Sequence, residues 1–219
     1  MAPAVTATHV PESEPAAEYE DAHVHQVYDH IAGHFASTRY KPWPIIAAFL
    51  AGLRDGWIGL DAGTGNGKYL PLPLDRPGHL WTIGLDRSRN LLEIARTAGG
   101  SEREVVWGDV LGHAWRPQIF DYAFSIATIH HLATPERRKV AVKDVFVPWV
   151  LSDDKTKVFQ RYYHMFADGE LAALVTLAAE ELGLTVGPPH AALNTRGMEI
   201  VQDGWERSNH YVELRLWQS

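Results

Sequence analysis

An aspartate, three alternating glycines and a lysine follow one another in the segment GLDAGTGNGKYL at residues 59–70. A backbone this rich in glycine lets a ligand approach closely, because glycine has no Cβ and adopts positive φ angles readily. Two further acids, Asp86 and Asp109, follow two later apolar runs. Clustered acids repel phosphate and attract a cation. The pattern therefore favours a positively charged ligand with a ribose, which indicates S-adenosylmethionine.

Two other glycine-rich nucleotide sites do not fit the spacing. A P-loop needs Gly-Lys followed by Ser or Thr, with another glycine upstream, but Tyr69 follows Lys68 and Ala62 fills the upstream position. A dinucleotide fingerprint is G-x-G-x-x-G, whereas these glycines recur at every second residue. A tight strand-to-helix turn without a ligand is the remaining alternative. We regard this alternative as the less favoured one, because three successive predicted strands end in aspartate.

Each acid has an expected role toward the cofactor. Asp61 would take the ammonium group, Asp86 the two ribose hydroxyls and Asp109 the exocyclic amine of the adenine. The complete expected cofactor set is Tyr28, Asp61, Ala62, Gly63, Gly65, Asn66, Gly67, Asp86, Arg87, Asp109, Val110 and Ala127.

Strands that alternate with helices must position these residues. Apolar runs predict strands at 57–63, 79–88, 104–110 and 119–127, and helical periodicity predicts helices at 22–35, 41–53, 87–100 and 168–184. Residues 197–217 are expected to form an antiparallel hairpin that turns at 207–209. This order predicts an α/β fold with a mostly parallel sheet, a C-terminal antiparallel hairpin and extra N-terminal helices.

The composition is that of a globular protein. The 219 residues are 46% hydrophobic and 21% charged, and cysteine is absent, which excludes disulfides and fits a reducing compartment. The net charge of −7 argues against nonspecific nucleic-acid binding. We expect residues 1–21 to form a disordered acidic tail and residues 22–219 to form a single domain. No apolar run is long enough to span a bilayer.

Seven blocks in chain order resemble one methyltransferase family. They are VYDHIAGHFASTRYKPWP, DAGTGNGKYL, GLDRSRNLLEIAR, SIATIHHLATPERR, VFVPWVL, VFQRYYHMFADGEL and ERSNHYVELRL. Together they resemble the eukaryotic tRNA wobble-uridine carboxymethyl methyltransferases, and the glycine block resembles class I S-adenosylmethionine-dependent methyltransferases in general. The resemblance implies a Rossmann-like fold and methyl esterification of 5-carboxymethyluridine in the tRNA anticodon stem-loop, giving 5-methoxycarbonylmethyluridine. It also implies a cytoplasmic heterodimer with a small zinc-binding activator, for which 103–111 is the expected pairing strand.

One segment of the family pattern is absent from this sequence. In the family, a Gly-Gly turn and a fifth core strand follow the block that ends in ERR. Here the sequence ERRKVAVKDVFVPWV passes directly to the VPW block, so the family segment is missing near residues 142–143. Two alternatives therefore stay open: a small-molecule O-methyltransferase of the same fold, and a non-catalytic member that binds a partner.

A carboxylate acceptor needs positioning more than it needs a base. It is ionised at neutral pH, and a bidentate arginine would hold it well; Arg39 and Arg207 are the candidates. His130 is the expected hydrogen-bonding partner near the substrate, and no metal site is expected. The candidates for stacking on the base are Trp43, Trp149, Tyr162, Tyr163 and His164, half or more of which we expect in the core, and those for contacting phosphates are Lys41, Arg137, Arg138, Lys139, Lys143 and Arg161.

Overall fold

The computed structural model describes residues 3–8, 10–11, 13–112, 115–133, 144–152, 154–190 and 194–219. The chain divides into two compact units. The first unit contains residues 1–133 and 145–163, and the second contains 134–144 and 164–219. This division differs from the single domain that we expected over residues 22–219.

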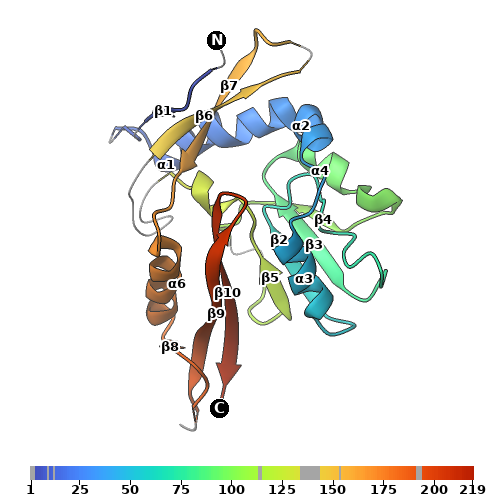
Figure 1. The fold of residues 1–219 in the computed structure, drawn as a ribbon, viewed down its shortest axis with the longest axis vertical. Helices are drawn as coiled ribbons and strands as arrows, with labels where there is room; N and C mark the ends of the chain where they lie inside the picture. The colour runs from blue at the N-terminus through green and yellow to red at the C-terminus, as the bar shows by residue number, and fades with distance from the viewer. Residues whose placement is uncertain are drawn as a thin grey trace. The chain divides into compact units, whose positions relative to one another are not determined.

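A four-stranded parallel sheet forms the centre of the first unit (Figure 1). Its order is β4 (Val105–Trp107), β3 (Trp81–Asp86), β2 (Ile58–Ala62) and β5 (Tyr122–Phe124). Because the strands are parallel, their carboxyl ends meet at one edge of the sheet. The expected parallel sheet is confirmed, and its strand ends gather the acids that the sequence singles out.

Three helices of the first unit also follow the predicted pattern. They are α2 (Gln26–Thr38), which continues a π-helical turn at Asp21–His25, α3 (Pro44–Gly52) and α4 (Arg89–Ala95). Ser88 caps α4 by accepting a hydrogen bond from the backbone N–H of Leu91 at 3.2 Å. Asp29 of α2 accepts from the Ser88 hydroxyl and from the backbone N–H of Asn90. These bonds fix α2 to the start of α4.

The N-terminal residues are structured where their acidity predicts a disordered tail. Strand β1 (Thr6–Ala7) pairs with β6 (Asp144–Val150), which neighbours β7 (Val158–His164) in a second sheet. Helix α1 (Ala16–Glu20) buries its last two residues, Tyr19 and Glu20. The Glu20 carboxylate accepts from the backbone N–H of Ala133 at 2.6 Å, so a buried donor offsets the cost of removing this charge from water.

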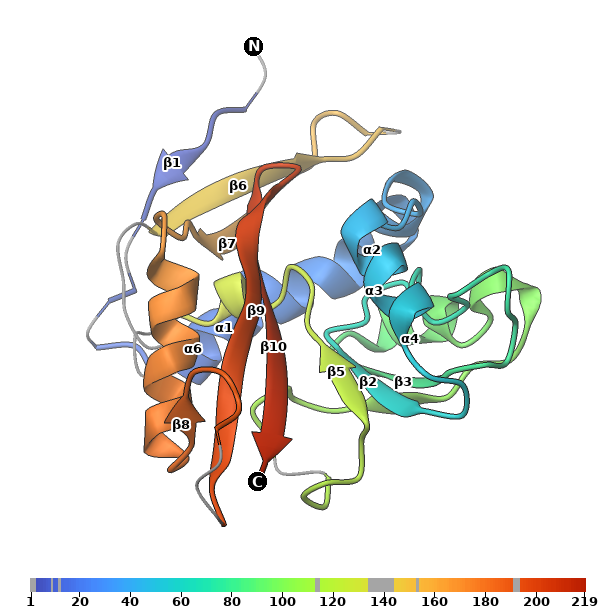
Figure 2. The ribbon, with the colours of Figure 1, turned by 60° about the horizontal axis from the view of Figure 1, so that its bottom comes forward.

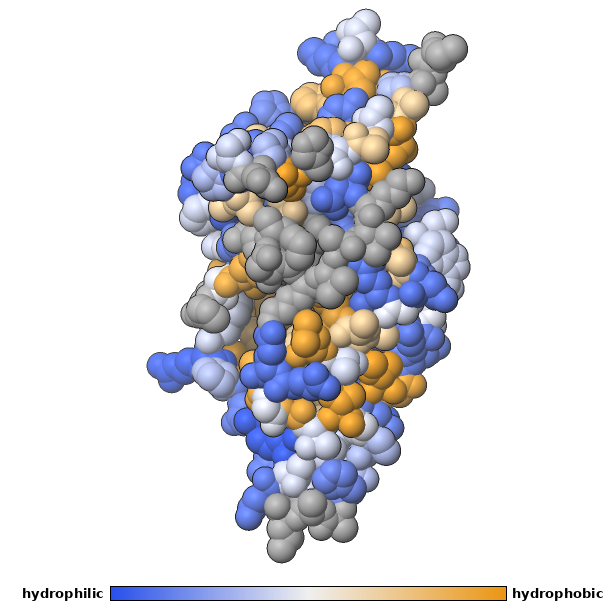
Figure 3. Space-filling view, turned by 90° about the vertical axis from the view of Figure 1, so that its left-hand side faces the viewer, coloured by the Kyte–Doolittle hydropathy of each residue, from blue (hydrophilic) through white to orange (hydrophobic). Residues whose placement is uncertain are grey.

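The second unit combines a helix with a three-stranded sheet. Helix α6 (Glu170–Glu181) precedes β8 (Thr185–Val186) and runs beside the hairpin of β9 (Arg196–Glu206) and β10 (Asn209–Gln218) (Figure 2). The hairpin turns at Arg207 and Ser208, both at positive φ, as a two-residue type I′ turn requires. Large apolar side chains on α6 and β8 are exposed, and Figure 3 shows apolar surface interrupted by hydrophilic residues.

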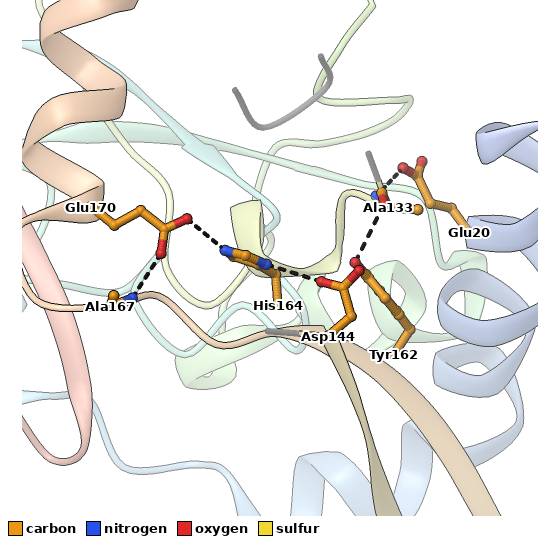
Figure 4. Close-up of polar contacts among 7 residues, drawn as sticks. All are labelled: Glu20, Ala133, Asp144, Tyr162, His164, Ala167 and Glu170. Carbon is orange, nitrogen blue, oxygen red and sulfur yellow. Dashed lines mark hydrogen bonds and ion pairs between the residues drawn. The ribbon is translucent and has the colours of Figure 1, made fainter. Parts of the chain in front are cut away.

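A buried histidine between two carboxylates links the start of the second unit to α6 (Figure 4). The Nδ1 atom of His164 lies 3.0 Å from Asp144, and its Nε2 atom lies 2.8 Å from Glu170. The other oxygen of Glu170 accepts from the backbone N–H of Ala167 at 2.7 Å. His164 is 1% exposed, so these contacts replace its hydration.

The described part of the parallel sheet ends at β5, and the C-terminal hairpin belongs to a different sheet. The predicted family gap near residues 142–143 lies outside the described residues. In the described ranges, no helix is long and apolar enough to cross a membrane.

Candidate active site

The glycine turn after β2 is built tightly against its neighbours. Gly63 has a φ of 92°, and a Cβ at this position would lie 2.0 Å from the hydroxyl oxygen of Thr128. The backbone N–H groups of Gly63 and Thr64 both donate to the carbonyl of Leu85, at 2.8 and 2.9 Å. A side chain at position 63 would force this turn apart, so the glycine is structurally required there.

Asp61, at the end of β2, is a buried acid with one unpartnered oxygen. Its side chain accepts from the Thr64 hydroxyl at 2.8 Å through Oδ2, whereas Oδ1 is buried and has no hydrogen-bonding partner in the described structure. Burial raises the pKa of Asp61 to about 7, and the neighbouring Asp86 adds to the rise. A cationic ligand would relieve both the burial cost and the missing contact.

Asp86 and Asp109 are held by contacts within the protein. Asp86 accepts from the backbone N–H of Gly65 at 2.8 Å and from that of Ser88 at 2.9 Å, and burial raises its pKa. Each oxygen retains a second lone pair that a ribose hydroxyl could reach. Asp109 forms an ion pair with Arg87 at 3.1 Å and accepts from the backbone N–H of Leu111. Two of the expected cofactor residues therefore pair with each other.

The other expected cofactor residues surround the same strand ends. Asn66 is buried and donates to the carbonyl of Arg39 at 3.4 Å. The carbonyl of Ala62 accepts from the Ser125 hydroxyl, and Ala127 adopts a φ of 55° in the turn after β5. The remaining members of the set are Gly67, which packs against α4, and Val110, which lies in the turn after β4.

Tyr28 lies in a cluster of aromatic and basic side chains instead of on the glycine turn. Its hydroxyl is 3.0 Å from Nε2 of His131 and 3.2 Å from the hydroxyl of Tyr163, and it accepts from Arg161 at 3.2 Å. Phe35 connects this cluster to the turn, because its ring packs against Tyr28 and a Cβ at Gly65 would lie 3.7 Å from it.

The two adjacent histidines differ in burial. His131 is 8% exposed, and burial together with the nearby His130 lowers its pKa well below the usual value. Its Nδ1 atom lies 2.7 Å from the carbonyl of Tyr162, so Nδ1 carries the proton of the neutral ring and Nε2 is an acceptor. His130 is less buried and stacks on Tyr163, with ring centroids 4.4 Å apart.

The candidate arginines occupy different places. Arg39 is exposed at the end of α2, with its guanidinium 5.2 Å from the ring centre of Trp149. Arg207 lies in the hairpin turn of the second unit, exposed to solvent. Their roles, and that of His130, stay predictions.

Several stacking and phosphate candidates are buried. Tyr162, Trp149 and His164 are at most 6% exposed, in agreement with the expectation that half or more of the aromatic set is core. Tyr163 and Trp43 are partly buried. Lys41 is exposed, but Arg161 is 6% exposed and so does not lie on a phosphate-binding surface. The other four cations of the set, Arg137, Arg138, Lys139 and Lys143, fall outside the described residues.

Sequence reasoning missed the importance of Arg161 and the role of Thr64. Thr64 lies within the glycine motif, three residues after Asp61. This short spacing between a hydroxyl and a carboxylate could have indicated their hydrogen bond. Arg161 follows Gln160 and precedes Tyr162 in the block VFQRYYH, so the local sequence does not indicate whether its side chain faces the interior or the surface.

Comparisons with known proteins identify the fold of this chain. Residues 60–146 match the methyltransferase domain family. A solved structure described as the DhpI–SAM–HEP complex shares the fold with a TM-score of 0.51 at 17% identity, over 86% of this chain and 93% of that one. The family match and the fold therefore define a class I methyltransferase domain, as expected.

Curated relatives define the family more narrowly. The tRNA (carboxymethyluridine(34)-5-O)-methyltransferase of Schizosaccharomyces pombe is 33% identical, over 89% of this chain and 96% of that protein. The enzyme of the same name from Saccharomyces cerevisiae is 39% identical over 65% of this chain and 61% of its own length. An Arabidopsis thaliana enzyme of that name is 45% identical over 58% of this chain and 30% of its own length. The chain belongs to the tRNA (carboxymethyluridine(34)-5-O)-methyltransferase family, which confirms the predicted resemblance.

Proposed function

We propose that this chain uses S-adenosylmethionine to methylate the carboxylate of 5-carboxymethyluridine at the wobble position of tRNA. The observation that carries the proposal is the buried, unpartnered oxygen of Asp61 beside the glycine turn, in a chain of this family. Asp61 would hold the cationic part of the cofactor, and Asp86 would accept from its ribose.

The chemistry requires the protein to position its substrates and to exclude water. When bound, the cofactor supplies a methyl group on a positively charged sulfur, and the electron pair of the breaking C–S bond stays on that sulfur. The acceptor carboxylate is already ionised at neutral pH, so no residue has to remove a proton. The protein must hold the reacting atoms in line and desolvate the acceptor while keeping its charge paired.

A flipped wobble base would enter beside the turn that follows β5. Bases in single-stranded loops can be splayed out and stacked on aromatic rings. His130 and Tyr163 stack on each other on this side of the first unit, and both are partly exposed. Their exposed ring surface is the proposed contact for the base, with His130 as a hydrogen-bonding partner.

A small zinc-binding activator is the proposed partner, and β4 is the proposed docking strand. In the described sheet, β4 pairs only with β3, so its other side offers unpaired backbone groups. Trp107 of this strand is 56% exposed, which leaves apolar surface for a partner to cover. We place the reaction in the cytoplasm, where a cysteine-free chain of this family would meet tRNA.

The direct test is transfer of labelled methyl from S-adenosylmethionine to tRNA that carries 5-carboxymethyluridine, using the chain co-expressed with the activator. The expected product is a base-labile methyl ester at the wobble position. Full activity on free small acids without RNA would favour a small-molecule methyltransferase instead. Partner binding without cofactor binding by calorimetry would favour a non-catalytic member.

A Trp107→Lys substitution tests the docking strand. The change places a charge on the exposed edge and should reduce recovery of the activator in co-purification. Trp81→Lys is a matched control, because Trp81 is also exposed at 59% but belongs to the inner strand β3. Equal recovery of the activator with the Trp107 variant and the unaltered chain would refute this docking strand.

A further inference from the structure

Arg161 is a buried cation without an anionic partner in the described residues. Its side chain is 6% exposed on β7, and its hydrogen bonds to other described residues all go to neutral hydroxyls. Its Nε atom is buried and has no hydrogen-bonding partner in the part of the chain that the structure describes. Buried charges in proteins are normally paired, because an unpaired one loses its hydration without compensation. An anion from outside the chain would complete this site.

The free donors of Arg161 form one edge of its guanidinium group. Nη1 uses its two protons on the hydroxyls of Tyr28, at 3.2 Å, and of Tyr163, at 2.8 Å. Among the described contacts, the Nε–H and the two Nη2–H donors remain unused. Nε and Nη2 together make the fork that binds both oxygens of a carboxylate. The two tyrosines therefore fix the orientation of the group and leave its carboxylate-binding edge unused.

Aromatic faces hold the guanidinium in place. Its central carbon lies 4.6 Å from the ring centre of Trp149 and 5.0 Å from that of Tyr163. Such stacking partly offsets the burial of a cation without neutralising it. The charge of Arg161 stays available to a ligand.

The surroundings of Arg161 carry no carboxylate among the described contacts. Arg39 lies over the same Trp149 ring, and His131 is neutral because its pKa is lowered by burial and by nearby positive charge. Two phenol rings, those of Tyr28 and Tyr163, also lie beside the guanidinium, and burial raises the pKa of Tyr163 well above its usual value. The cluster is thus electropositive, and its burial suits a small planar carboxylate better than a backbone phosphate.

A short chain of contacts connects this cluster to the cofactor turn. The Trp149 ring packs on Phe35 at 5.7 Å, and a Cβ at Gly65 would lie 3.7 Å from the Phe35 ring. On the other side, Tyr163 stacks with His130 from the turn after β5. All of these residues belong to the first unit. The unused guanidinium edge therefore belongs to the region where an acceptor must meet the methyl donor.

We propose that Arg161 binds the carboxylate of the acceptor nucleoside through its Nε–Nη2 edge, with Tyr28 and Tyr163 as positioning residues. This assignment rests on the proposed function, and it replaces Arg39 and Arg207 as the carboxylate-binding arginine. Nε is covered in the free protein, so this proposal requires the side chains over it to move aside when the acceptor enters.

The test compares a charged acceptor with a neutral one of the same shape. The complex with its activator is titrated with two anticodon stem-loops, one with 5-carboxymethyluridine and one with 5-carbamoylmethyluridine at the wobble position. S-adenosylhomocysteine is present, so that binding is measured without reaction. The variants are Arg161→Met, Arg161→Lys and Arg76→Met; Arg76 is a control because it already pairs with Asp55 at 2.8 Å. Calorimetry of S-adenosylhomocysteine binding and thermal unfolding check that each variant is folded.

The unaltered complex and the Arg76 variant should prefer the acid about tenfold or more, the size expected for a hydrogen-bonded charge pair. Arg161→Met should bind both stem-loops equally, and Arg161→Lys should keep only about a two- to threefold preference, because lysine lacks the fork. If the methionine variant does not fold, the lysine variant decides.

An undiminished acid preference in a folded Arg161 variant overturns this assignment and leaves the proposed function standing. Failure of the unaltered complex to bind either stem-loop, although it binds S-adenosylhomocysteine, overturns both.

Discussion

Replacing Asp61 by asparagine should stabilise the free protein above neutral pH and weaken cofactor binding. The pKa of this carboxyl rises from 3.8 to about 7 on folding. At about 1.4 kcal/mol per pKa unit, the ionised group costs the folded state about 4 kcal/mol. The buried Asp61 is 1% exposed, so solvent screening does not reduce this figure greatly.

The sign of the pH dependence follows from linkage. A group whose pKa is raised by folding contributes stability that is fully present below its unfolded pKa and is lost as the pH rises through its folded pKa. The unaltered protein should therefore lose stability from about pH 4 to about pH 7 through Asp61. The amide of the Asp61→Asn variant does not titrate, so the stability difference between variant and unaltered protein should grow by about 2.5 kcal/mol from pH 5 to pH 8.

The absolute gain will be smaller than the full cost of the charge. The new amide N–H₂ group would lie where Oδ1 now has no partner, and an unsatisfied buried polar group costs about 1–3 kcal/mol. We expect a net stabilisation of about 1–3 kcal/mol at pH 8 and little or none at pH 5.

Urea unfolding at the two pH values measures the stability, and calorimetry with S-adenosylmethionine measures the binding. The unaltered protein should bind the cofactor about tenfold more tightly at pH 8 than at pH 6, because the cation needs an ionised Asp61. The variant should bind weakly at both. Asp121→Asn is the matched control, since Asp121 accepts from the backbone of Ile58 at the opposite end of β2. A stability difference that does not change with pH, or unchanged cofactor affinity in the variant, would refute this reasoning.

Three further substitutions test the packing around the site. Gly63→Ala should cost at least about 2 kcal/mol in urea unfolding, because it adds a strained turn and overpacking against Thr128. Gly78→Ala is the control, since Gly78 also has a positive φ but open space around it, and should cost only about 1 kcal/mol. Equal losses for the two variants would contradict the clash with Thr128. Tyr28→Phe removes a hydroxyl shared by His131, Tyr163 and Arg161 and should cost about 1–2 kcal/mol in the same assay, with an unchanged unfolding midpoint counting against this network. His164→Gln removes the imidazole between the buried Glu170 and the partly buried Asp144 and should cost about 3–5 kcal/mol in thermal or urea unfolding. A loss below about 1 kcal/mol would show that the cluster contributes little.

The parallel sheet and its acidic edge could be predicted because local signals agree there. Short apolar runs that end in aspartate, a serine cap at Ser88 and glycines after β2 each indicate the same βα units. The strand-end acids then follow from topology alone, since parallel strands finish at one edge. The sequence of each of these elements therefore indicates its secondary structure within a few residues.

The N-terminal segment shows where composition misleads. Its acidity and prolines suggested disorder, but Tyr19 packs in a cluster with Val24 and Tyr162, and Glu20 finds a backbone donor at Ala133. These contacts are made to residues more than a hundred positions away or on the following turn. No local pattern reports such a distant partner, so a tertiary contact overrides the composition.

The arginine cluster was beyond sequence reasoning for a related physical reason. An arginine next to tyrosines in a strand is as easily placed on the surface as in the interior, and the choice depends on which element covers it. Here α2 supplies Tyr28 and Phe35 to cover β7, and β6 supplies Trp149. The candidate arginines chosen from the sequence, Arg39 and Arg207, are both exposed.

In the first unit, the acidic side chains at the glycine turn are separated from the buried Arg161. Asp61 and Asp86 line the glycine turn, whereas Arg161 lies among aromatic rings, and no ion pair joins the two groups in the described structure. Had these groups paired, each would have neutralised the other, and neither would attract a ligand. Phe35 packs between the turn and the Trp149 ring and so keeps apolar surface between acid and base. In the described part of the first unit, a cationic donor and an anionic acceptor would then each find a site of matching charge, which favours a fixed placement of the two substrates.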